Sequence, residues 1–203
     1  MNRYLLIASA AVLVLAGCNK PGSGAASDAA AASAASAAPK VDAVALAGTQ
    51  PDVEAQAPAT AMFIENIGVA DMFEIKAAEI AAKKSKNNDV KGLAKATSKD
   101  HAKILDNLKQ AIKDSGRADL EAPTQLSEEK EAMLSDLDKV PDNLFDAMYV
   151  TQQITVHGDA ERLLSRYAAH GEVAQLKSFA EKTDKTIQGH LDKAHDIQTK
   201  MNK

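Results

Sequence analysis

The stretch from Glu172 to Met201 reads EVAQLKSFAEKTDKTIQGHLDKAHDIQTKM. From Leu176 onward, one set of side chains recurs after alternating steps of four and three residues: Leu176, Ala180, Thr183, Ile187, His190, Ala194 and Ile197. This spacing places them along one face of a long α-helix, and a mainly apolar face of this kind is the seam that a helical bundle buries. His190 therefore places an imidazole within the seam.

The chain before this stretch shows the same periodicity from about residue 61. Helix-ending and helix-starting residues divide it, with Asp89 expected as an N-cap, Gly116 and Gly171 as stops, and Pro141 in a first turn. We predict four long helices and a shorter one, at residues 61–86, 89–115, 127–139, 141–170 and 172–201. No stretch has the β-branched alternation of a strand. Short connections within the first and last pairs predict an all-α, antiparallel four-helix bundle, with the short helix between the second and third long helices.

Each predicted long helix carries one ionisable group on its apolar face. The predicted helix at 89–115 has a stripe comparable to that of the last helix: Val90, Leu93, Thr97, His101, Ile104 and Leu108. The stripe at 141–170 is less regular and contains His157, and the stripe at 61–86 places Glu74 among small apolar residues. We therefore expect four groups to point into the bundle: Glu74, His101, His157 and His190.

The first residues have the features of an export signal. A positively charged start at Arg3 precedes an apolar run from Tyr4 to Ala16, which is too short to span a membrane. The following Gly17-Cys18 completes a sequence that resembles the bacterial lipoprotein box. That resemblance implies a signal peptide at residues 1–17, lipidation of Cys18, and, with Asn19 after the cysteine, sorting to the periplasmic side of the outer membrane. The alternative is an ordinary signal peptide with an incidental cysteine.

Residues 18–60 are rich in Ala, Ser, Gly and Pro and lack sustained apolar periodicity. We interpret them as a lipidated cysteine followed by a flexible tether, which makes residues 61–203 the folded domain. The net charge of −4 and the 3% aromatic content argue against a nucleic-acid partner. A single cysteine excludes a disulfide framework and any zinc site built from several cysteines. The expected membrane contact is through the lipid anchor.

The predicted domain resembles a bacterial family whose function is uncharacterised. Its members are often labelled outer membrane proteins and are grouped with ferritin-like four-helix bundles. The resemblance runs from about Met62 to Ile197 and is carried by these stretches: Gly68–Glu74, Val90-Lys91, Asp100-His101, Phe145–Tyr149 with His157, and His190-Leu191. The chain departs from the family at Lys185, where a proline is common. The resemblance implies a ferritin-like fold without an established activity.

A metal site is one interpretation of the inward groups. The di-iron pattern pairs Glu with His three residues later, but the residues three before the histidines are Ser98, Ile154 and Ile187. A mononuclear site of Glu74, His101, His157 and His190 for one transition-metal ion remains, with Asp100 and Tyr149 as groups that support these ligands from behind. Counted from the turn at Gly171, however, His157 and His190 differ in depth by about 7–8 Å. The alternative is that these are core histidines satisfied by Glu74, Tyr149, Asp100 or backbone.

The chain contains no phosphate-binding Gly-rich loop, no His-Glu-x-x-His motif, and no Ser, His and acid arrangement on which a triad could be argued. The sequence therefore favours a non-enzymatic role. We expect an outer-membrane-anchored periplasmic lipoprotein that acts by binding an envelope protein or polymer, or through an envelope-structural role. The alternative function is a metal-binding protein, or a metal-dependent redox or hydrolytic protein, that uses the inward His and Glu side chains.

Overall fold

Five α-helices and their connections make up the part of the chain that the computed structural model describes, which is residues 58–203. No strand occurs within these residues. The predicted all-α, four-helix-bundle-like fold with one extra helix is confirmed. The predicted signal peptide, the lipidated Cys18 and nearly all of the predicted tether lie outside the described residues. The helices are α1 (Thr60–Lys84), α2 (Asn88–Asp114), α3 (Glu128–Lys139), α4 (Asp142–His170) and α5 (Ala174–Met201).

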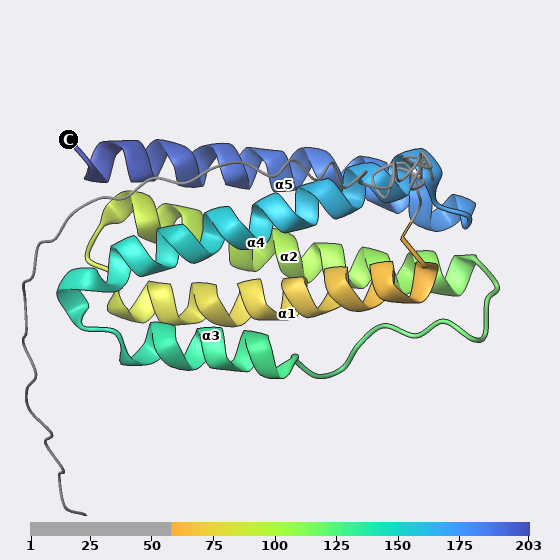
Figure 1. Ribbon diagram of the computed structural model, residues 1–203, viewed down its shortest axis with the longest axis horizontal. Helices are drawn as coiled ribbons and strands as arrows, with labels where there is room; N and C mark the ends of the chain where they lie inside the picture. The colour runs from red at the N-terminus through yellow and green to blue at the C-terminus, as the bar shows by residue number, and fades with distance from the viewer. Residues whose placement is uncertain (1–57) are drawn as a thin grey trace, which may run out of the picture. The chain divides into compact units, whose positions relative to one another are not determined.

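The bundle consists of two helical hairpins. Helix α1 packs mainly against α2, and α4 packs mainly against α5. Contacts of α2 with α5 and of α1 with α4 join the two hairpins, while α3 lies against α1 on the outside (Figure 1). Within the described residues, no helix is both long enough and apolar enough to cross a membrane. We call α1–α2 the first hairpin and α4–α5 the second.

Side-chain caps explain where two of the helices begin. The Asn87 side chain accepts hydrogen bonds from the backbone N–H groups of Asp89 and Val90, at 2.8 and 3.4 Å, so Asn87 caps α2. The predicted N-cap, Asp89, instead lies inside the first turn, where its negative charge suits the helix dipole. The Ser127 hydroxyl accepts from the Lys130 N–H at 3.2 Å and caps α3.

The buried core is divided by a polar layer. One apolar cluster contains Ile67, Ile104, Leu164 and Ile187. A second, toward the other end of the bundle, contains Phe73, Leu93, Tyr149 and Ala194. Every long helix passes from one cluster to the other, and at or beside the crossing each buries a polar group: Asp71 on α1, His101 on α2, His157 on α4 and His190 on α5. The polar layer therefore lies inside the bundle rather than at an end.

Two contacts outside this layer fix α1. The Thr60 hydroxyl bonds to the Tyr167 hydroxyl at 2.8 Å and to Glu172 Oε1 at 2.9 Å, which holds the first turn of α1 against the second hairpin. Farther along, Pro123 in the connection between α2 and α3 packs on Gly68, where a β-carbon would lie 2.5 Å from the Pro123 Cγ atom. Only a glycine permits this close approach.

Candidate metal centre

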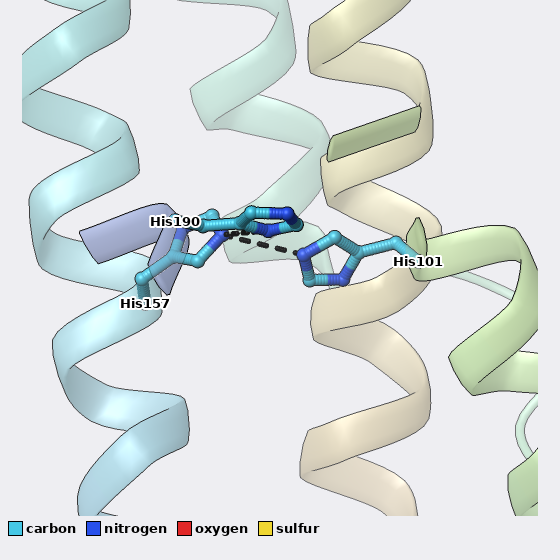
Figure 2. Close-up of side chains that lie close together, drawn as sticks. All are labelled: His101, His157 and His190. Atoms are coloured by element: carbon cyan, nitrogen blue, oxygen red, sulfur yellow. Dashed lines mark hydrogen bonds between the residues drawn. The ribbon is translucent and has the colours of Figure 1, made fainter. Parts of the chain in front are cut away.

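Three imidazole rings meet inside the bundle. His101 on α2, His157 on α4 and His190 on α5 point toward one another (Figure 2), and their ring centroids are 5.2, 5.4 and 5.6 Å apart. The His157 Nε2 atom lies 3.3 Å from His101 Nε2 and 3.4 Å from His190 Nδ1. One nitrogen from each ring lies within 4.8 Å of the other two, and all three residues are buried. We call these residues the His triad.

The outer nitrogen of each ring faces an oxygen atom. His101 Nδ1 lies 2.7 Å from Asp71 Oδ1, His157 Nδ1 lies 2.9 Å from the Gln153 carbonyl, and His190 Nε2 lies 3.1 Å from Asp100 Oδ2. A carbonyl oxygen only accepts, so His157 Nδ1 carries the proton and its Nε2 presents a lone pair. In the tautomer in which His101 and His190 donate from their outer nitrogens to Asp71 and Asp100, the inner nitrogens of all three rings present lone pairs.

Burial keeps the His101 and His157 rings neutral. Removal from water, with a smaller contribution from the neighbouring His190, lowers the pKa of His101 to about 3, although Asp100 opposes the shift. Burial likewise lowers the pKa of His157 to about 3, with the other two histidines adding to the effect. A neutral imidazole is the form that binds a metal ion. At neutral pH His101 and His157 are therefore in the ligand form.

Glu74, the fourth group predicted to be a ligand, is buried but lies outside the triangle. Its Oε1 is 3.6 Å from His157 Nδ1, on the outer side of that ring, and its Oε2 accepts a hydrogen bond from the Gln153 side chain at 2.6 Å. Burial raises the pKa of Glu74 to about 8. The structure therefore brings three of the four predicted ligands together and places Glu74 beside them.

Of the two groups predicted to support the site, Asp100 lies against the triad and Tyr149 does not. Asp100 accepts from His190, whereas Tyr149 is buried in the second apolar cluster. Burial, with Glu74 nearby, raises the pKa of Tyr149. Tyr149 therefore contributes packing, and it makes no recorded hydrogen bond to the histidines within the described residues.

Sequence analysis missed Asp71 and Gln153. Asp71 belongs to a stripe with alternating steps of three and four that the structure buries throughout: Ile64, Ile67, Asp71, Glu74, Ala78 and Ala81. The stripe predicted for this helix passed through Ala70 instead, and so it did not include Asp71. Gln153 holds His157 through its backbone carbonyl and Glu74 through its amide. Gln153 lies four residues before His157, on the same face of the helix, and this spacing was the signal in the sequence that could have identified it.

The depth difference expected between His157 and His190 does not separate them. The connection runs from Gly171 to Val173, so its centre is Glu172, which lies fifteen residues after His157 and eighteen before His190. Side chains also lean toward the N-terminus of their own helix. In an antiparallel pair this lean carries His157 away from the connection and His190 toward it, so the rings meet.

The triad fits the coordination shell of a transition-metal ion. At a metal–nitrogen distance of 2.0–2.1 Å, ligand nitrogens in trigonal or tetrahedral geometry lie about 3.3–3.6 Å apart. The two short contacts, of 3.3 and 3.4 Å, fall in this range. The oxygen atoms on the outer nitrogens are the partners that orient metal-binding imidazoles.

Buried atoms without partners also surround the triad. Asp71 Oδ2, Glu74 Oε1 and Gln153 Oε1 have no hydrogen bond within the described residues. Buried polar atoms in folded proteins nearly always have a partner, so a group of orphans indicates a place where an ion or water belongs. Burial raises the pKa of Asp71 and of Glu74, so each would balance the charge of a cation by losing its proton when the cation binds.

Comparison with known proteins places the chain in a family. The family model described as "Domain of unknown function (DUF4142)" matches residues 44–197, and the chain belongs to this family. The solved structure described as "CopM in the Cu(I)-bound form" is similar in fold, with a TM-score of 0.58 over 70% of this chain and 96% of that chain, at 17% identity. At this identity the likeness concerns the fold. No curated protein matches the chain.

Proposed function

We propose that this domain binds a single transition-metal ion through His101 Nε2, His157 Nε2 and His190 Nδ1. The observation that carries the proposal is the convergence of three buried ring nitrogens whose outer partners all face oxygen atoms. With the outer nitrogens carrying the protons, the inner lone pairs of the three rings face one another and repel. A cation at their centre removes that repulsion.

Copper is the metal that the available observations favour. Imidazole nitrogens suit copper, zinc, iron and nickel, so the donor set narrows the choice to these ions. The fold neighbour is described in a Cu(I)-bound form, which supports copper within this group. We therefore propose a copper-binding role and treat zinc as the competing outcome.

Metal titration of the whole chain tests this proposal. We expect one equivalent of Cu(I) to bind, measured by competition with a chromogenic chelator, and binding to be lost in His157→Asn. The matched control is His195→Asn, because His195 is exposed on α5 and stands outside the triad. Tight binding of Zn(II) with weak binding of Cu(I) would reassign the metal. Equal Cu(I) affinity in both variants would contradict the proposed site.

We propose further that the domain is held at the periplasmic side of the outer membrane through Cys18. The support is the apolar run that ends in Gly17-Cys18 and the Asn19 that follows. In the bacterial host, globomycin should cause the unprocessed precursor to accumulate, and Cys18→Ala should prevent labelling with a palmitate analogue. Asn19→Asp should shift the labelled protein toward the inner-membrane fraction. Normal processing in globomycin would refute the anchor and leave the metal site unaffected.

A further inference from the structure

A small cavity adjoins the His triad. It is lined by Asp71, His101 and His157 on the side of the triad and elsewhere by Thr183 and mainly apolar residues, including Val156 and Ala160. The space open to the centre of a water-sized sphere is about 10 Å³, which corresponds to about one water molecule. This cavity is therefore large enough for about one water molecule and too small for a metabolite.

One polar atom in the cavity wall has no partner. Asp71 Oδ1 holds His101 Nδ1, while Asp71 Oδ2 is buried and makes no hydrogen bond within the described residues. Asp71 is 2% exposed, so bulk water does not satisfy this oxygen. A small ligand in the cavity would give Oδ2 the partner that the protein does not supply.

We propose that the triad leaves one coordination position open and that this position takes a ligand of water or diatomic size in the cavity. The inference rests on the proposed metal site. Three protein ligands and an open fourth position distinguish reactive metal sites from closed structural ones. The surrounding apolar side chains exclude larger ligands.

A surface cleft lies next to this cavity. A cleft of about 440 Å³ lies outside it, between α1, the start of α3 and α4. Ile67, Ala70, Val156 and Ala160 line both the cleft and the cavity. These shared residues therefore separate the cavity from the cleft, and a small molecule would enter from the cleft by displacing their side chains.

Carbon monoxide is a suitable probe, because it binds Cu(I) and has a strong infrared stretch. We expect the Cu(I)-loaded whole chain to take up one equivalent of carbon monoxide. Ala160→Val places two more methyl groups in the cavity wall and should lower carbon monoxide affinity at least tenfold, with Cu(I) affinity within threefold of wild type. The matched control is Ala147→Val, the same change at an exposed site on α4.

A second variant tests the inference by gain of binding. Val156→Ala removes two methyl groups from the cavity wall and should let methyl isocyanide bind the Cu(I)-loaded chain at least tenfold more tightly than wild type. Loss of folding cannot produce such a gain. A Cu(I)-loaded wild type that takes up no carbon monoxide, or identical affinities in Ala160→Val and Ala147→Val, would overturn the open position and leave the metal site standing. Failure to bind Cu(I) would overturn both.

Discussion

Asp71 is the residue on which the orientation of the triad most depends. It holds His101 Nδ1 at 2.7 Å from α1, a helix that contributes no member of the triad. Carboxylates in this position fix the ring and raise its basicity, and their loss typically costs 10–100-fold in metal affinity. The helix without a histidine therefore takes part in the site through Asp71, with Glu74 beside His157.

We expect Asp71→Asn to weaken Cu(I) binding by about 10–100-fold. The amide oxygen still accepts a hydrogen bond, but it lacks the charge that balances a cation. Competition against a chelator measures the change, and Glu79→Gln, on an exposed site of α1, is the matched control. An affinity within twofold of wild type would show that Asp71 does not support the ligand.

Glu74 should make the stability of the metal-free protein depend on pH. Its pKa is raised by burial from 4.5 to about 8, so the folded protein retains a proton that the unfolded chain has lost between these values. The free energy of unfolding therefore falls as pH rises through this window. Glu74→Gln removes the effect, since glutamine is neutral and can still accept from the Gln153 amide.

The difference in unfolding free energy between Glu74→Gln and wild type should grow by a few kcal/mol from about pH 5 to about pH 8, at roughly 1.4 kcal/mol per pKa unit. Urea unfolding with a chelator present measures it. His101 and His157 act in the opposite direction, because their lowered pKa values make stability rise with pH between about 3 and 6.5. Both proteins keep these histidines, so the difference isolates Glu74. A constant difference would contradict the raised pKa.

At the scale of the helices, two glycines make a matched pair. A β-carbon on Gly68 of α1 would lie 2.5 and 2.6 Å from the rigid ring of Pro123, whereas one on Gly92 of α2 would meet nothing within 4 Å. We expect Gly68→Ala to destabilise the domain by about 1–3 kcal/mol through overpacking. Gly92→Ala should stabilise it by about 0.5–1 kcal/mol through helix propensity. The urea unfolding midpoints of the two variants measure these changes. Equal effects of Gly68→Ala and Gly92→Ala on the midpoint would contradict the Pro123 contact.

The helices were predictable because their signals are local. Every predicted helix boundary lies within two residues of the observed one, since apolar spacing, glycines, prolines and caps act over a few residues. Even so, the cap of α2 proved to be Asn87 rather than Asp89. Both residues have capping side chains, and only backbone geometry distinguishes them.

The candidate site was predictable in residue type but not in arrangement. Position along a seam identified His101, His157 and His190 as inward groups, and the structure brings them together. Which of two acids on α1 faces a histidine depends on the rotation of that helix, so Glu74 was chosen and Asp71 was missed. The relative depth of His157 and His190 in the bundle depends on the tilt of each side chain toward the N-terminus of its helix. A count of residues from the connection does not include this tilt.

For the whole molecule, the triad joins the two hairpins. His101 comes from the first hairpin, and His157 and His190 come from the second. A metal ion bound here connects both halves of the bundle and binds only the folded state. Metal binding should therefore appear as a gain in global stability rather than as local ordering.

With free Cu(I) buffered at about 100 times its dissociation constant, we expect a gain of about 2.7 kcal/mol and a rise in Tm of about 5–10 °C. Differential scanning calorimetry of the whole chain measures it. His190→Asn should show no rise, while His170→Asn, at an exposed site on α4, should behave as wild type. A Tm that is independent of Cu(I) in the wild type would contradict this coupling.

The bonds from Thr60 to Tyr167 and Glu172 also determine where the bundle carries mechanical load. A pull on the chain before Thr60 acts first on these bonds, at the closed end of the second hairpin, before it unwinds α1. Tyr167 lies ten residues beyond His157, which is about 15 Å along the helix. The bonds that resist this tension therefore lie at a distance from the histidines. A force applied to the start of α1 would break them before it separated the three rings of the triad.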